Sequence, residues 1–295
     1  MAYLLVAWSL SVGFFLLPLA GLLLLTRPVT FREWAWVFVA FLWAGLWFSR
    51  PAPAHLQVAK AASVMATGTL VALRLARPSL RPGDLILAAV GLGAAGTVFW
   101  CASLGISWES IHAAALQEGY QGYRRVLGRI GAGGPSRQLA VESFRAAVTA
   151  VAVLFPGLAA LIGLAGLRLA WGWHRRIARR PLEPDPRPFT AFRFNDHLVW
   201  ALVAALALVL LGPIGPTSLV GQNLLLVFGT LYAIRGTAVV TAMSAGLPRF
   251  VALVFAVSAV LLFPFAATAL MLLGLADTWI DVRRRLPPLH GGETR

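Results

Sequence analysis

Few ionisable side chains in this chain are placed where they could do chemistry, and Arg235 is the most conspicuous. It lies near the centre of the apolar run Leu219–Ala245. If that run crosses a membrane, a central arginine costs roughly 2.5–3.5 kcal/mol on insertion scales, so polar groups must meet it. A guanidinium can bind a carboxylate or phosphate through parallel hydrogen bonds. We therefore expect Arg235 to face the bundle interior, either binding an anionic ligand or forming a structural ion pair, with Asp277 and Glu142 as internal partners.

Two carboxylates with helical spacing close the last apolar run. Asp277 and Asp281 stand four residues apart and are followed by Arg283, Arg284 and Arg285. Paired carboxylates could hold a metal or shuttle protons, but oppositely charged side chains at this spacing pair readily on a helix. We predict a salt-bridged helix end at the membrane interface, with Trp279 at headgroup level.

Polar residues of the last two long apolar runs define a candidate ligand site. The set is Asn223, Tyr232, Arg235 and Asp277. The chain has no HExxH motif, no nucleophile elbow and no Walker loop, and its histidines are not spaced as metal ligands. We therefore predict no catalytic residue, no metal site and no cofactor, which weakens an enzyme hypothesis without excluding it. Lys60, inside another apolar run, is expected to snorkel or to pair with a carboxylate.

The composition places these residues in a membrane protein. Hydrophobic residues make up 59% of the 295 residues and charged residues 12%, against roughly 25% charged in soluble domains. The net charge of +14 comes largely from arginines at the ends of apolar runs, where they anchor helix ends to lipid headgroups. The expected partner is the lipid bilayer and not nucleic acid.

The apolar runs predict an all-α, polytopic transmembrane helix bundle of about eight spans, because a span needs about 20 apolar residues. The expected spans are Tyr3–Leu25, Trp34–Phe48, His55–Leu75, Leu85–Ile106, Ala146–Trp173, His197–Leu211, Leu219–Ala245 and Phe250–Ala276. Pro156 and Pro264 fall inside two of them and should kink their helices, either as packing kinks or as openings at a binding site.

The spans divide the chain into two halves around a polar segment. We expect a four-span half in residues 1–106, a polar segment in 107–145, a second four-span half in 146–285 and a tail in 286–295. Within the polar segment, Trp108–Ile130 has the pattern of an amphipathic helix lying at the membrane surface.

Residues Phe155 to Arg285 resemble the YybS-like family of uncharacterised bacterial multi-pass membrane proteins. The residues that carry the resemblance are Phe155-Pro156-Gly157, the Arg175–Arg180 cluster, Phe189, Phe192-Arg193-Phe194, Trp200, Gln222-Asn223, Tyr232, Gly236, Gly274, Asp277, Trp279, Asp281 and Arg283-Arg284-Arg285. The family is distantly similar to the substrate-binding components of energy-coupling-factor transporters. This resemblance implies a role in small-molecule transport in the bacterial inner (cytoplasmic) membrane. Arg235 departs from the family pattern, which has a neutral polar residue there.

Two functions from different classes follow. The first is a transport or substrate-capture component without its own ATPase, binding a small anionic ligand and energised by a partner subunit or an ion gradient. The second is a non-catalytic scaffold or assembly partner of another membrane complex, docking through Ser107–Arg145. A membrane enzyme is a third. A cavity reaching Arg235 favours the first, and internal pairing of Arg235 in a filled bundle favours the second.

The arginine clusters leave the orientation open, because three apparent spans separate Arg175–Arg180 from Arg283–Arg285 and the positive-inside rule would place both in the cytoplasm. Single cysteines introduced into each loop of a Cys101→Ala variant should settle it by labelling with a membrane-impermeant thiol reagent. We expect residues 107–145 to label from one side. Full labelling of Leu85–Ile106 or Ala146–Trp173 would contradict this architecture.

Overall fold

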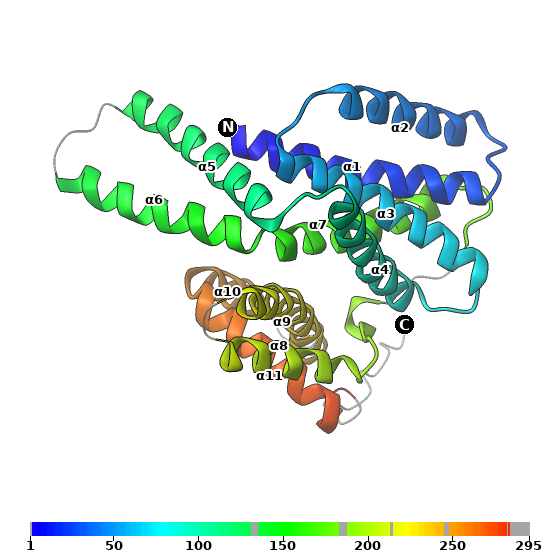
Figure 1. Ribbon diagram of the computed structural model, residues 1–295. Helices are drawn as coiled ribbons and strands as arrows, with labels where there is room; N and C mark the ends of the chain where they lie inside the picture. The colour runs from blue at the N-terminus through cyan, green and yellow to red at the C-terminus, as the bar shows by residue number, and fades with distance from the viewer. Residues whose placement is uncertain are drawn as a thin grey trace. The chain divides into compact units, whose positions relative to one another are not determined.

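The computed structural model describes residues 2–130, 135–182, 188–212, 215–244, 248–281 and 283. Every regular element in this part of the chain is a helix, which confirms the all-α prediction. The chain forms two compact units, a first unit of Met1–Pro184 and a second unit of Asp185–Arg295 (Figure 1). The expected tail of residues 286–295 lies outside the described residues.

The first unit is built around a core of four packed helices. Its elements are α1 (Ala2–Leu25), α2 (Phe31–Ser49), α3 (Ala54–Ala76), α4 (Pro82–Ser103), α5 (Trp108–Ile130), α6 (Pro135–Val153) and α7 (Phe155–Ile177). Phe14 and Leu22 of α1 pack in one buried cluster with Leu70 of α3, Leu85 of α4 and Trp171 of α7. Helix α2 packs on the outside of α1.

The polar segment forms a helical hairpin that projects from the first unit (Figure 1). Helix α5 has the bounds expected for the amphipathic helix, Trp108–Ile130, and α6 packs back against it. The hairpin joins the core through α3, where His55 Nε2 lies 3.0 Å from Glu118 Oε2 of α5. Ile111, on the predicted apolar side, is buried.

Prolines divide two of the expected spans into separate helices. Ala146–Trp173 is interrupted at Leu154, where α6 ends and α7 begins. Phe250–Ala276 is interrupted at Leu262. In each case a proline stands within the first two positions of the next helix, where its missing N–H is not needed, and it clashes with a continuing helix before it. The expected kinks thus appear as one-residue interruptions, with helical backbone hydrogen bonds on either side of each.

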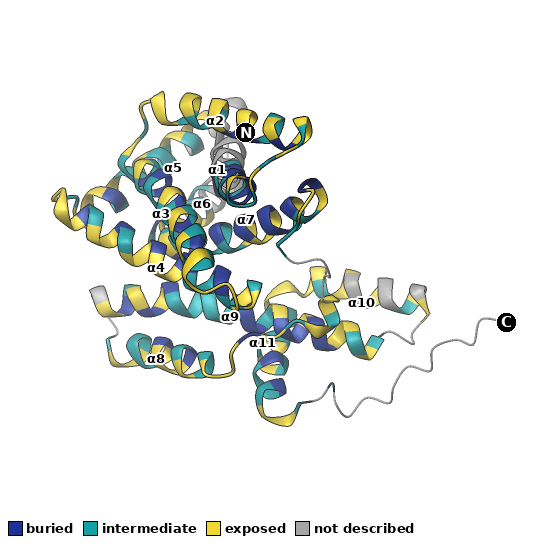
Figure 2. Cartoon of the chain, turned by 90° about the vertical axis from the view of Figure 1, so that its right-hand side faces the viewer, coloured by how far each residue is buried: buried dark blue, intermediate teal, exposed yellow. Residues whose placement is uncertain are grey.

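The second unit is organised along one long helix. Its elements are the 3₁₀ turn η1 (Phe189–Ala191), α8 (Leu198–Leu211), α9 (Pro216–Met243), α10 (Arg249–Leu261) and α11 (Phe263–Ile280). Helix α8 packs along the first half of α9, where Gly221 lies against Ala205. Helix α11 packs along the second half, where Gly236 lies against Leu270 (Figure 2). The first residues of α8 and the last residues of α11 therefore both lie beside the middle of α9.

Five helices in the described part of the chain are long and apolar enough to cross a membrane. They are α3, α4, α7, α9 and α11. Two shorter apolar stretches are Val12–Leu25, which is part of α1, and Leu198–Leu211, which is α8. The chain is thus a multi-pass helical membrane protein. The expected number of about eight spans is only approximate, because five described helices meet both criteria. Helix α8 has 14 residues, which gives about 21 Å, less than the ~30 Å hydrocarbon core.

Exposed residues run along the outer sides of several helices (Figure 2), and many of them are large and apolar. Exposed examples are Phe38, Phe41 and Leu42 on α2, Val260 and Leu261 on α10, and Phe263 and Phe265 on α11. Soluble proteins rarely expose apolar patches of this kind. Contact with lipid accounts for them.

The α9–α11 contact depends on two glycines. A Cβ on Gly236 would overlap the carbonyl oxygen of Leu270, and one on Gly274 would overlap that of Tyr232. We predict that Gly236→Ala or Gly274→Ala separates the helices and lowers the free energy of unfolding by about 1–3 kcal/mol, measured by thermal unfolding in detergent. The control is Gly68→Ala, because a Cβ at Gly68 meets nothing within 4 Å. Equal melting temperatures for Gly274→Ala and the control would contradict the prediction.

Candidate functional site

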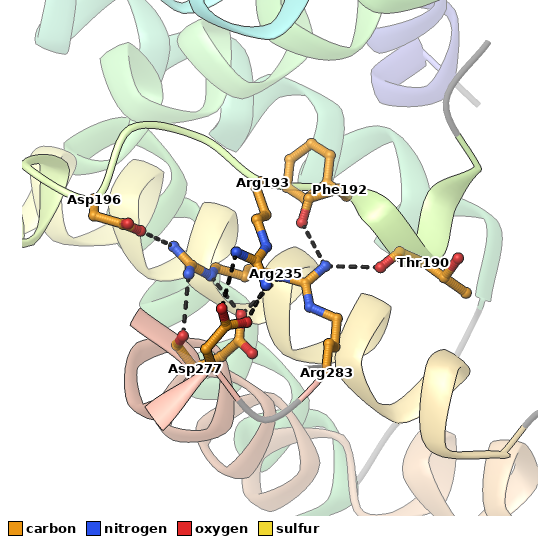
Figure 3. Close-up of polar contacts among 8 residues, drawn as sticks. Thr190, Phe192, Arg193, Asp196, Arg235, Asp277 and Arg283 are labelled. Carbon is orange, nitrogen blue, oxygen red and sulfur yellow. Dashed lines mark hydrogen bonds and ion pairs between the residues drawn. The ribbon is translucent and has the colours of Figure 1, made fainter. Parts of the chain in front are cut away.

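Arg235 lies in the last third of α9 and is 1% exposed. Its Nε donates to Asp277 Oδ2 at 3.0 Å and its Nη2 to the Asp277 backbone oxygen at 3.3 Å. Its Nη1 donates to Asp196 Oδ1 at 2.7 Å (Figure 3). The predictions that Arg235 faces the interior and that Asp277 meets it are confirmed. Glu142, the other partner considered, is exposed on α6 of the first unit.

Asp277 connects Arg235 to a second arginine. It lies in the last turn of α11, is 1% exposed, and its Oδ2 also accepts a hydrogen bond of 2.7 Å from Arg283 Nη2. Arg283 Nη1 donates to the backbone oxygens of Thr190 and Phe192 at 2.7 and 3.0 Å (Figure 3). Arg283 therefore ties the segment around η1 to the end of α11.

A separate ion pair lies at the end of α11. Arg193 pairs with Asp281, which ends the helix in a left-handed conformation with φ 48°. Both carboxylates of the predicted helix end thus pair with arginines, as expected, although the partners come largely from other elements. The network itself consists of Arg235, Arg283, Asp196 and Asp277 and is balanced in charge, and the Arg193–Asp281 pair lies beside it.

Phe194 holds the loop before α8 against this network. Its ring is 6% exposed, lies 5.5 Å from the Arg235 guanidinium and meets the Tyr232 ring edge-on at 5.1 Å between centroids. A cation over an aromatic face is attracted by its quadrupole, more strongly when both are desolvated. The loop is therefore fixed at Phe194, two residues before Asp196.

Hydrogen-bonding capacity is left over beside the guanidinium. Asp277 Oδ1 is buried and has no hydrogen-bond partner in the described part of the chain, and the buried hydroxyls of Tyr232 and Thr278 lie within reach of each other beside it. Buried polar groups are nearly always satisfied in folded proteins, by protein groups, water or ligand. Two hydroxyls and one carboxylate oxygen offer a bound molecule both donors and acceptors.

The structure brings together three of the four predicted site residues. Tyr232 and Arg235 are one turn apart on α9, and Asp277 faces them from α11. Asn223 lies 12 residues before Arg235, about 18 Å along the helix, and its side-chain amide donates to the Leu219 oxygen at 2.9 Å. Sequence reasoning missed Asp196. Its one signal is a lone acidic residue in a short polar loop before an apolar run.

Lys60, the buried cation of α3, binds the end of a neighbouring helix. Lys60 Nζ donates to the backbone oxygens of Trp47 and Arg50 at 2.6 and 2.9 Å. These carbonyls belong to the end of α2, where the backbone lacks helical partners and cations are favourable. Lys60 therefore neither snorkels nor pairs with a carboxylate, which corrects the expectation. It closes the end of a neighbouring helix.

Glu33, just before the expected span of α2, forms a second buried polar site in the first unit. Its carboxylate accepts hydrogen bonds of 2.7–2.9 Å from Val29 N, from Thr30 N and Oγ1, and from Arg179 N after α7. Burial by itself raises the pKa of Glu33, but these hydrogen bonds outweigh it and lower the pKa to about 2. Glu33 thus fastens the start of α2 to the chain leaving α7, which is a structural role.

No group of three potential metal ligands occurs among the described residues. The ion network of the second unit is the candidate functional site, because it gathers buried charges and an unpartnered carboxylate oxygen.

We predict that Arg235 and Asp277 are strongly coupled. Arg235→Leu should cost about 3–5 kcal/mol in unfolding free energy, because it leaves Asp277 buried without this partner. The Arg235→Leu/Asp277→Leu double variant should lose much less than the sum of the single losses. The control is Arg193→Gln, which breaks a more exposed pair and should cost about 0–1 kcal/mol. Additive losses, or a stable Arg235→Leu protein, would refute the coupling.

Comparison with known proteins shows the family to which the chain belongs. No curated protein and no solved structure matches the chain. A family model described as "Predicted membrane protein (DUF2232)" matches residues 1–278. The match includes Arg235 and Asp277 and extends well beyond the segment in which a family resemblance was visible by residue pattern. The chain belongs to this family of membrane proteins, DUF2232.

Proposed function

We propose that this protein captures a small anionic molecule in the membrane, as a transport component without its own ATPase. The proposal is supported by the position of Arg235, where α8 begins and α11 ends beside an uninterrupted α9. Transporters form polar sites at membrane depth from interrupted helices. Irregular backbone is tolerated there because it faces protein or a polar cavity and not lipid.

One observation carries the proposal: the two carboxylates that bind Arg235 differ in exposure. The Asp277 side chain is 0% exposed, whereas that of Asp196 is 62% exposed. A largely exposed carboxylate thus covers one end of a buried guanidinium, and the buried Asp277 Oδ1 beside it has no hydrogen-bond partner in the described part of the chain. Arg235, Tyr232 and Asp277 would hold the ligand, and Asn223 is a further candidate residue along α9.

The resemblance of Phe155–Arg285 to the YybS-like family, with its distant similarity to energy-coupling-factor substrate-binding components, agrees with this role. The chain carries no ATPase motif, so an energising subunit or an ion gradient would drive transport. The location would be the bacterial cytoplasmic membrane.

A scaffold function is the alternative, and a specific observation favours it. All three guanidinium nitrogens of Arg235 are bonded within the chain, and the surrounding network is balanced in charge. A network of this kind can serve to fix helix positions alone. The projecting α5–α6 hairpin would then be the surface that docks another membrane protein.

Mass spectrometry of small molecules released by denaturing the purified protein separates the two functions. We expect a small anionic compound from the wild type and from Arg193→Gln. We expect at least a tenfold loss from Arg235→Lys, which keeps the charge but not the planar fork. Equal melting temperatures of Arg235→Lys and wild type would exclude unfolding as the cause. A wild type that carries no such compound, or an equal yield from Arg235→Lys, would overturn capture.

A further inference from the structure

Arg235 has a permanent side and an exchangeable side. Its Nε and Nη2 face Asp277, through both the carboxylate and the backbone oxygen, at a point where Asp277 is also held by Arg283. Its Nη1 faces Asp196 alone among the described residues. Asp196 lies in the loop before α8 and not in a helix.

The loop can release Asp196 without coming apart. Phe194 remains buried against Tyr232 and beneath the guanidinium, and Asn195 Oδ1 accepts a hydrogen bond of 3.0 Å from the His197 backbone N–H. The Asp196 side chain projects from this fixed turn toward Arg235 (Figure 3). Its carboxylate gains full hydration when it turns outward, since more than half of it is already exposed.

We infer that Asp196 is a latch that occupies the ligand's place, and that the ligand is a small molecule bearing a single carboxylate. This inference rests on the proposed capture function and adds the ligand class and an internal competitor. The ligand carboxylate replaces that of Asp196 on Arg235 Nη1. Other polar groups of the ligand pair with Tyr232 Oη, Thr278 Oγ1 and Asp277 Oδ1.

Charge balance selects this class. With Asp196 in place, Arg235 and Arg283 meet Asp196 and Asp277. When Asp196 turns out, one positive charge remains, and one carboxylate restores neutrality. A neutral molecule would leave the buried guanidinium under-compensated, and a cation would add to the excess charge. A carboxylate also matches the geometry of a guanidinium edge.

The latch lowers the apparent affinity of the wild type. A ligand that binds only the unlatched state has its dissociation constant divided by the fraction of molecules in that state. Removing the Asp196 carboxylate should therefore tighten binding of any carboxylate at Arg235 by about tenfold or more, if the latch is closed in nine molecules of ten.

Acetate tests the exchangeable position without knowledge of the natural ligand. We expect a saturable rise of about 3 °C in the melting temperature of full-length Asp196→Ala. The wild type should need at least tenfold more acetate. Chloride at equal ionic strength and neutral acetamide control for salt and shape. Asp281→Asn is the matched variant: it removes the partner of exposed Arg193 and should show no saturable response. Asp196→Asn, which keeps an oxygen for Nη1, provides a second variant should Asp196→Ala fold poorly.

The outcomes separate the latch from the capture function. No saturable acetate effect in either Asp196 variant, or equal affinity in the wild type, overturns the latch. Mass spectrometry of retained compound gives the other readout, and we expect Asp196→Ala to retain more than the wild type. A retained compound that depends on Arg235 but is unchanged in Asp196→Ala overturns the latch and leaves capture standing. An acetate effect with no compound retained by any variant supports the exchangeable carboxylate and overturns capture.

Discussion

The second unit depends on the contact between the Arg235 guanidinium and the Asp277 carboxylate. Both side chains are about 1% exposed, so each would be prohibitively costly without the other. The pair forms because Gly236 and Gly274 let α9 and α11 approach until their backbones almost touch. Once Asp277 is in place, its second partner Arg283 draws in the η1 segment through two carbonyl oxygens. One buried charge thus positions a helix end and a connecting segment.

In the first unit, buried charges are compensated by backbone groups at helix ends. Glu33 satisfies backbone N–H groups at the start of α2 and one after α7, and Lys60 satisfies carbonyls at the end of α2. Helix ends leave unsatisfied backbone groups, which are expensive where water is scarce. Charged side chains from neighbouring helices replace water there, which explains why ionisable residues are retained in so apolar a chain.

The two proposed functions make different use of one network. For a scaffold, the charge-balanced pairing of Arg235 and Arg283 with Asp196 and Asp277 would be sufficient, because it fixes the positions of α9, α11 and the loop before α8. For a capture component, the unequal exposure of Asp277 and Asp196 is the essential feature. A purely structural pair gains little from a partner that is largely in water. That asymmetry is why capture is the function that the geometry supports best.

The sequence by itself determined the membrane class, the approximate positions of most helices and the interior placement of Arg235, and it narrowed the partner of Arg235 to Asp277 or Glu142. These follow from local rules: apolar length, proline positions, and the need of a buried charge for a carboxylate when few are available. Only the tertiary structure decided that Asp196 is the second partner and that Lys60 closes the end of α2. Asp196 and Arg235 are 39 residues apart. Such a contact depends on how helices cross, and glycine-mediated crossings are set by backbone shape across the interface and not by any pattern along one helix.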